Sequence, residues 1–245
     1  AGDPLGAFIA VVAGVEVGRL VAGKTKVDII LTPLVTIVSG GVVGAIVGPP
    51  LANGMAWLGN AIQVATELQP FIMGIVISVV MGMILTLPIS SAALSIILGL
   101  SGLPAGAATI GCSTQMIGFA VASFRENKWD GLLAQGIGTS MLQVPNIVKN
   151  PKIWIPPTLA SAILGPFATV VFKMSNNPSG GGMGTSGLVG QIMTWQTMAP
   201  TTNHIVLIIE IIMLHFVLPA VLTLIISEFM RKKGWIKFGD MKLDV

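Results

Sequence analysis

The chain has 245 residues, of which 53% are hydrophobic and 9% are charged, and its formal net charge is +3. Soluble globular domains carry roughly 25% charged residues, so this composition and a mean hydropathy of +0.88 exclude an ordinary soluble domain. They predict an all-α polytopic protein in a lipid bilayer, and the small positive charge does not indicate a nucleic-acid partner.

Several kinds of chemistry have no motif in this sequence. It contains no GxxxxGK[ST] loop for nucleotide phosphates and no HExxH zinc motif. Its single cysteine, Cys112, leaves no CxxC pair and is expected to pack as a small apolar residue. We therefore predict no cofactor, no metal site and no catalytic nucleophile of the chain's own.

Apolar runs predict about five full membrane spans plus re-entrant or broken helices. Basic residues follow the first span, recur around Arg125 and fill the tail Arg231–Lys237. Because loops rich in Lys and Arg stay in the cytoplasm, these positions predict a cytoplasmic C-terminus. The chain opens with Ala-Gly-Asp-Pro rather than Met, so we expect that N-terminal helices are missing from a single domain over residues 1–245. The predicted full spans are Leu5–Ala22, Ile29–Val47, Phe71–Leu87, Pro156–Phe172 and Asn203–Phe229.

Two segments near the second span predict something other than a crossing helix. Pro49 and Pro50 are expected to stop that span, because proline removes a helical hydrogen bond. The following segment, Ala52–Thr66, is too short and too polar to cross and predicts a re-entrant or partly buried helix. Glu67 then begins a long apolar run just ahead of Pro70. An acid at an intramembrane helix start is costly, so Glu67 is a functional candidate, although capping the next helix is the alternative.

The stretch Leu85–Phe124 is the centre of the prediction. Its apolar runs Ala92–Leu100 and Met116–Phe124 are each too short to cross a hydrocarbon core of about 30 Å. Between them, Pro104–Gln115 is rich in small and polar residues, which predict a break in the helix. We therefore expect two half-helices that meet at membrane depth, where transporters commonly hold their substrate.

A second interruption runs over Ser175–Gly187, ahead of the short apolar run Leu188–Trp195. Glycines before a helix start leave backbone N–H groups free to bind an anionic ligand, although a flexible external linker has a similar composition. Upstream, Asn146 and Asn150 lie in a proline-framed polar loop. They could bind a sugar, but a role in the turns is the commoner explanation.

The last span carries two titratable residues, Glu210 and His215. Because they are five residues apart, they cannot share one helix face, so Glu210 needs a partner from another helix. Pro219 lies four residues after His215 and removes the usual partner of its carbonyl group. Together the two side chains could form a proton or polar relay, although a hydrogen-bonded packing histidine is the commoner case.

Three runs carry a resemblance to a known family. They are ATELQPF at Ala65–Phe71, NPKIWIPPTLASAILGP at Asn150–Pro166 and GGGMGTSGLVGQI at Gly180–Ile192. Together they resemble the membrane-spanning IIC subunits of the bacterial sugar phosphotransferase system, in a divergent branch that includes the perfringolysin O regulators. Glu67 is the position that best matches the family's sugar-binding acid, although here two residues separate it from the proline.

The resemblance implies a homodimer in the bacterial cell membrane with a sugar site built from re-entrant hairpins and a glutamate. It also implies a separate cytoplasmic IIB subunit, whose phosphocysteine phosphorylates the sugar. We therefore predict a permease for a small polar solute, such as a sugar or sugar acid. The alternatives are a sensor that binds the solute without transport and an ion-coupled transporter that uses Glu210 and His215. The predicted solute-binding residues are Glu67, Gln69, Thr114, Gln115, Thr185, Ser186 and Gln191.

Overall fold

The computed structural model describes residues 4–243. Residues 1–3, on which the expectation of missing N-terminal helices rests, lie outside the described part, as do residues 244–245. Most of the described residues are helical, and their only bridge of β type joins Gly102 to Asn176. The predicted all-α polytopic fold is confirmed. Within residues 4–243, four helical stretches are long and apolar enough to span a membrane, namely Asp28–Leu68, Gly102–Ala122, Pro151–Val171 and His204–Lys232, and Pro70–Thr86 is a shorter apolar helix.

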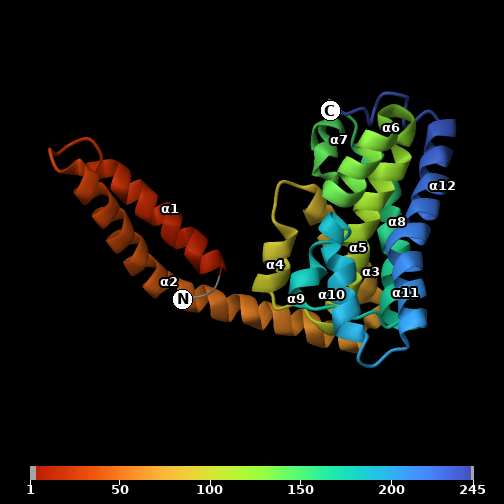
Figure 1. Cartoon of the computed structure of the whole chain (residues 1–245), viewed down its shortest axis with the longest axis horizontal. Coiled ribbons are helices and arrows are strands. Elements are labelled where there is room, and N and C mark those ends of the chain that lie inside the picture. Colours follow the sequence, from red (N-terminus) through yellow and green to blue (C-terminus); the bar gives the residue numbers. More distant parts are fainter. Residues whose placement is uncertain (1–3, 244–245) are drawn as a thin grey trace. The chain divides into compact units, whose positions relative to one another are not determined.

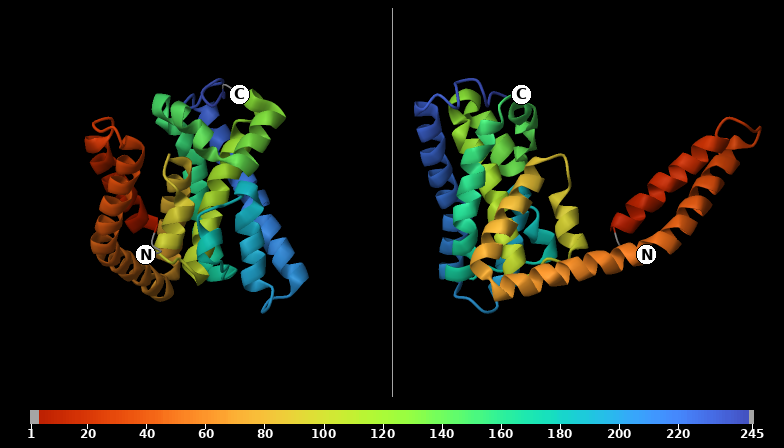
Figure 2. Two further views of the ribbon diagram at one scale, coloured as in Figure 1. Left: turned by 60° about the vertical axis from the view of Figure 1, so that its left-hand side comes forward. Right: turned by 180° about the vertical axis from the view of Figure 1, so that it is seen from behind.

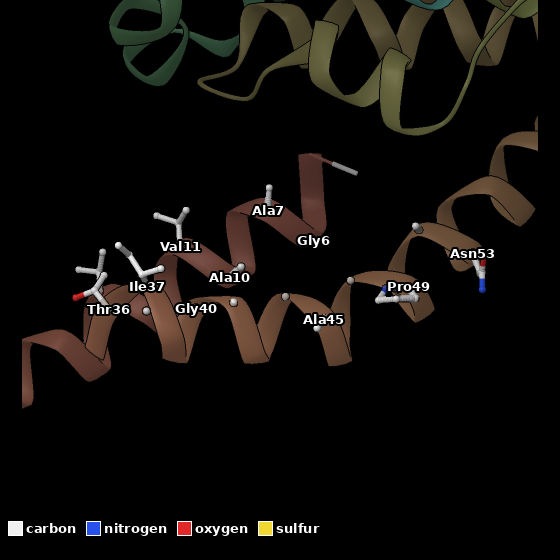
Figure 3. Close-up of a pocket in the computed structure, with 16 residues that line it drawn as sticks. Gly6, Ala7, Ala10, Val11, Thr36, Ile37, Gly40, Ala45, Pro49 and Asn53 are labelled. Carbon is white, nitrogen blue, oxygen red and sulfur yellow. The ribbon is translucent and has the colours of Figure 1, made fainter. Parts of the chain in front are cut away.

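The chain divides into two compact units, Ala1–Ala61 and Ile62–Val245, and the single domain over 1–245 stays a prediction. In the first unit, α1 (Pro4–Val21) packs against α2 (Asp28–Leu68) through glycines. A Cβ atom on Gly14 would meet the Thr36 carbonyl oxygen and Gly40. Figure 3 shows the groove of about 900 Å³ that these helices line with small and apolar side chains.

Helix α2 corrects one prediction. It continues without interruption over 41 residues, through Pro33, Pro49 and Pro50 and on through Ala52–Thr66. The prolines were expected to end the span, and the polar segment was expected to form a separate re-entrant helix. Prolines are tolerated in membrane helices where neighbouring helices, Ser and Thr side chains or local adjustments of the backbone satisfy the freed carbonyl groups.

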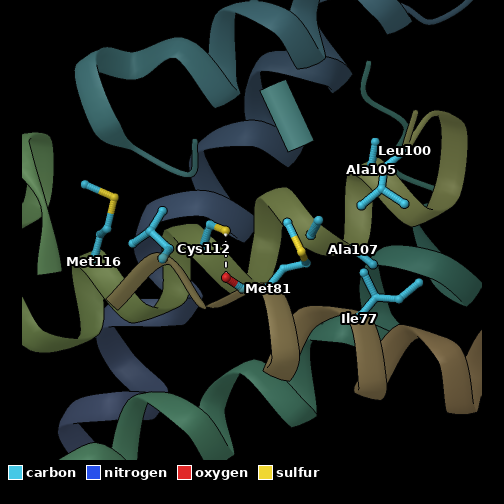
Figure 4. Packing of buried hydrophobic residues seen from close by; sticks show 9 residues of the cluster. Ile77, Met81, Leu100, Ala105, Ala107, Cys112 and Met116 are labelled. Atoms are coloured by element: carbon cyan, nitrogen blue, oxygen red, sulfur yellow. Dashed lines mark hydrogen bonds between the residues drawn. The ribbon is translucent and has the colours of Figure 1, made fainter. Parts of the chain in front are cut away.

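Helix α5 (Gly102–Ala122) lies at the centre of the second unit and is buried along almost its whole length. It packs against α3 (Pro70–Thr86), α8 (Ile155–Pro166) and α12 (Leu218–Lys232), as Figure 1 shows. In the cluster between α3 and α5, the Cys112 thiol donates to the Met81 carbonyl oxygen over 3.4 Å (Figure 4). The predicted packing of Cys112 as a small buried residue is confirmed.

The continuity of α5 overturns the prediction of a break at Pro104–Gln115. The small residues there serve close packing, because a Cβ on Gly106 would collide with the Met174 carbonyl and one on Gly111 with the Ser78 carbonyl. The Thr109 and Thr114 hydroxyls donate to the carbonyl groups four residues earlier. Polar side chains that are satisfied in this way do not interrupt a helix.

The chain instead breaks before α5, at residues 98–101. Gly99 and Gly102 both have a φ of +60° there, a conformation that favours glycine. The preceding helix, α4 (Ser91–Ile97), has seven residues. The second predicted interruption also contains short helices, which are α9 (Pro178–Gly181), η5 (Ser186–Leu188) and α10 (Val189–Met198).

Prolines accompany π-helical turns in two spans. Pro166 ends α8 and is followed by η4 (Phe167–Val171), while Pro219 follows η6 (Met213–Val217), which joins α11 (His204–Ile212) to α12. The disturbance at Pro219 was predicted from the sequence. The segment between α5 and α8 contains α6 (Phe124–Leu133), the π turn η1 (Ala134–Gly138), the 3-10 turn η2 (Ser140–Gln143), α7 (Val144–Lys149) and the 3-10 turn η3 (Pro151–Trp154).

Candidate functional site

A cavity of about 190 Å³ lies where segments distant in sequence meet inside the second unit. The end of α3 and the start of α4 form one side of it. Residues 138–141, which run from the end of η1 into η2, and the glycine-rich turn before α10 form the other side, and α5 contributes Met116. Its lining consists of Leu85, Leu87, Ile89, Ser90, Ser91, Ala92, Met116, Gly138, Thr139, Met141, Gly182, Met183 and Ser186.

Hydrogen bonds between separate segments hold these walls together. The Ser91 hydroxyl donates to the Gly182 carbonyl over 2.6 Å and so joins α4 to the glycine-rich turn. The Thr185 hydroxyl donates to the Gly136 carbonyl over 2.6 Å and joins the same turn to η1. A third bond, 2.9 Å long, joins the hydroxyls of Thr86 and Ser140. Each short element is therefore fixed by contacts with neighbouring segments rather than by a long run of its own helical hydrogen bonds.

The cavity lining contains hydroxyl groups and no charged side chain. Ser90, Ser91, Thr139 and Ser186 supply the hydroxyls, and apolar side chains such as Leu85 and Met116 cover the rest. Hydroxyls both donate and accept hydrogen bonds. This lining therefore matches a small solute with hydroxyl groups better than one that needs a charged partner.

One comparison with known proteins identifies the family. The family model described as "Phosphotransferase system, EIIC" matches residues 1–243. The chain belongs to this EIIC family. It is thus a multi-pass subunit of the bacterial membrane and a permease component of the phosphotransferase system, which works with a cytoplasmic IIB component. No curated protein and no solved structure matches it.

Two of the residues predicted to bind solute in this EIIC chain lie at the cavity or beside it. Ser186 lines it, and Thr185 is buried next to it with its hydroxyl engaged by Gly136. Thr114 and Gln115 are buried in α5 and bond within the protein. The Gln115 amide donates to Thr158 over 3.1 Å and accepts from Trp154 over 3.1 Å.

The structure does not bring Glu67 and Gln69 to this cavity. Both side chains are exposed, and the Glu67 carboxylate accepts a 2.8 Å hydrogen bond from the Gln63 amide. They precede α3, whereas the cavity lies at the far end of that helix. At 1.5 Å per residue, the 17 residues of α3 separate the two places by about 25 Å.

Gln191 and His215 form a pair that the sequence analysis assigned to different roles. The Gln191 amide nitrogen and His215 Nδ1 share a 3.0 Å hydrogen bond, and Ser113 lies 3.4 Å from the same amide nitrogen. The pair joins α10, η6 and α5 in the buried interior. Glu210 makes no hydrogen bond with His215 among the described residues, and its Oε2 atom is buried without a partner.

Several lining residues of this EIIC chain were missed from the sequence. Ser90 and Ser91 follow Pro88 in Leu-Pro-Ile-Ser-Ser, and the Ser90 hydroxyl accepts a hydrogen bond from the Ala93 amide at the start of α4. A proline followed by two serines is a recognisable helix start, and it marks one wall of the cavity. Thr139 carries no such signal, because only the tertiary fold brings it to Ser186. No group of three or more His, Cys, Asp or Glu side chains that could hold a metal ion occurs in residues 4–243.

Proposed function

We propose that this EIIC subunit binds a sugar or sugar acid in the cavity between α4, the η1–η2 segment and the glycine-rich turn. The observation that carries the proposal is the lining. Four side-chain hydroxyls from three segments border a space of about 190 Å³ with no charged side chain among its lining residues. Hydroxyls held at several angles suit a solute that itself carries several hydroxyl groups.

The short helices support a location inside the membrane. A span needs about 20 residues, whereas α4 has seven and α10 has ten. Helices of this length leave backbone groups that lipid cannot satisfy, so such segments are tolerated where they are buried in protein or line a wet cavity. We propose that α4 and α10 belong to re-entrant hairpins and that the cavity is the wet space beside them.

In this proposal the chain binds the solute, and the IIB subunit supplies the phosphoryl group. Its single cysteine is buried in α5 and bonded to the Met81 carbonyl, so it is not a phosphate carrier. The proposed cycle takes the phosphoryl group from the cysteine sulfur of a IIB subunit and places it on a solute hydroxyl. The S–P bond breaks, an O–P bond forms and the hydroxyl proton leaves to a base.

A binding screen followed by substitutions in the cavity tests this proposal. Purified protein is titrated with sugars, sugar acids and their phosphates, and Kd is measured for the solute that binds. Ser186→Ala and Thr139→Ala each remove one hydroxyl, so each is expected to weaken binding roughly two- to tenfold, the equivalent of about 0.5–1.5 kcal/mol. Ser179→Ala is the control, because Ser179 is exposed in the same glycine-rich region and does not line the cavity. Equal affinities in all three variants would contradict the proposed site.

Glu67 needs a separate variant, since it lies at the other end of α3. If it binds solute as the family resemblance implies, Glu67→Gln abolishes binding while the protein stays folded. Unchanged binding removes Glu67 from the site and leaves the cavity proposal intact.

Uptake distinguishes the permease from its two alternatives. We expect proteoliposomes that contain this chain and a IIB subunit to accumulate phosphorylated solute when a phosphoryl donor is present. Binding without accumulation or exchange would indicate a sensor. Uptake that needs no phosphoryl donor and collapses with the proton gradient would indicate an ion-coupled transporter with Glu210 and His215 as the relay.

A further inference from the structure

The last described residues, 233–243, do not extend away from the second unit. They fold back over the end that contains α6 and α7, as Figures 1 and 2 show. Ile236, Met241 and Leu243 are buried there. Residues 233–243, called the C-terminal segment below, therefore form part of the packed structure.

An ion pair fixes the beginning of the C-terminal segment. Arg231 at the end of α12 lies 3.3 Å from the Glu126 carboxylate, and the two side chains are only 10% and 1% exposed. The same carboxylate accepts a 2.8 Å hydrogen bond from the Gly239 amide. A buried pair of this kind is costly to break on one side, so it holds the segment against α6.

Amide side chains then hold the main chain of the segment. Asn127 donates to the Met241 carbonyl over 2.8 Å and accepts from the Leu243 amide over 2.8 Å. Gln143 donates to the same Met241 carbonyl over 3.0 Å, and Asn146 donates to the Lys242 carbonyl over 2.8 Å. These hydrogen bonds go to backbone groups of the segment, so they do not depend on the side chain of Lys242.

One of these amides belongs to the loop that lines the cavity. Gln143 also donates to Gln135 over 2.8 Å, which closes residues 135–143 into a loop. Gly138, Thr139 and Met141 from this loop line the cavity. The loop consists of a π turn and a 3-10 turn separated by the extended residue Thr139. Because it has no continuous helical hydrogen bonding, its shape depends on side-chain contacts such as those of Gln143.

We propose that the C-terminal segment positions the cavity loop, residues 135–143, through the Met241 carbonyl group. Gln143 and Asn127 meet at this one oxygen atom, so the segment joins the loop to α6. The effect on solute binding rests on the proposed function, whereas the positioning itself does not. We predict that removing the hydrogen bonds between Asn127 and the segment increases the mobility of the loop at Met141.

A spin label at residue 141 tests the positioning without any solute. The protein carries Cys112→Ala and Met141→Cys, and a nitroxide on that cysteine reports loop mobility in its resonance line shape. Asn127→Leu is the decisive variant, because both side-chain hydrogen bonds of Asn127 go to the C-terminal segment and neither goes to the loop. We expect a more mobile label at residue 141 in this variant. Gln143→Glu, which loses both donated bonds, is expected to act in the same direction.

Two controls separate positioning from general destabilisation. Lys242→Ala removes an exposed side chain and keeps the carbonyl group that Asn146 binds, so it is expected to leave the label unchanged. A second label on Ile208→Cys, at an exposed position in α11, is expected to stay unchanged in every variant. An unchanged label at residue 141 in folded Asn127→Leu protein overturns the proposal, and so does equal mobilisation at residue 208.

Solute affinity is measured afterwards on unlabelled Asn127→Leu and Gln143→Glu protein that keeps Met141, because Met141 itself lines the cavity. A mobilised loop with weaker binding supports both the positioning and the cavity site. A mobilised loop with unchanged binding upholds the positioning and contradicts the cavity as the solute site, so the two failures are distinguishable.

Discussion

Gly111 shows how one small residue sets the packing of the central helix. A Cβ atom there would collide with the carbonyl group of Ser78 on α3, so the two backbones lie too close for any side chain. Nearby, the Ser161 hydroxyl on α8 reaches the Gly111 carbonyl over 3.4 Å. Close backbone contact between membrane helices depends on such residues, because lipid gives little hydrophobic drive for association.

Replacing Gly111 by alanine is expected to destabilise the protein. The extra methyl group must push α3 and α5 apart, and overpacking of this kind costs about 1–3 kcal/mol. The measurement is the midpoint of unfolding in detergent, which we expect to fall. Gly54→Ala is the matched control, because Gly54 lies within α2 and its Cβ would meet nothing within 4 Å. That variant should be neutral or more stable by about 0.5–1 kcal/mol, since glycine weakens a helix interior. Equal losses in both variants would contradict the packing argument.

Individual polar residues were only partly predictable. The sequence identifies Glu210 and His215 as costly in a membrane span, because their chemistry is visible without a structure. It does not show that His215 bonds Gln191 from α10 or that Gln115 bonds Thr158 from α8, since these partners are 24 and 43 residues away. Long-range pairing leaves no local pattern, so the sequence finds such residues without finding their partners.

Helices and their interruptions were also predictable where the cause is local in the sequence and not where it lies in distant segments. Pro219 acts on its own helix, and the disturbance predicted there is present as the π turn η6. The polar run Pro104–Gln115 was read locally as a break, although α8, α3 and the main chain around Met174 enclose it as a continuous helix. Composition alone does not distinguish a helix break that lines a water-filled cavity from a closely packed helix, since small residues occur in both.

The short helix α4 makes a prediction about sidedness. If α3 and α4 form a re-entrant hairpin, the residues before α3 and after α4 lie on the same side of the membrane, and α5 then crosses to the other side. Single cysteines at Gln69, Ser101 and Asp130 in a Cys112→Ala background test this with a membrane-impermeant maleimide. We expect Gln69→Cys and Ser101→Cys to react from one side and Asp130→Cys from the other. Reaction of the first two from opposite sides would contradict the hairpin.

The distribution of charge over the second unit has a marked asymmetry. Every Lys and Arg between Ile62 and Leu243 except Lys173 lies in α6, α7, η3, the end of α12 or the C-terminal segment. Hydrogen bonds from Asn127, Asn146 and Asn150 to that segment bring these elements to one end of the unit. What the sequence showed as separate basic loops is thus a single basic end.

This basic end is predicted to face the cytoplasm, because positively charged segments resist translocation. Fusions at the C-terminus test the orientation. Green fluorescent protein fused after Val245 should fluoresce, and alkaline phosphatase at the same point should be inactive, since it folds only outside the cytoplasm. Fusions that truncate the chain after Lys173 give the matched control, because that residue precedes the strand-like contact of Asn176 with the opposite end of α5 at Gly102. They should show the reverse pattern. Active alkaline phosphatase after Val245 would contradict this orientation. The basic end and its C-terminal segment would then lie on the side that a cytoplasmic IIB subunit does not reach.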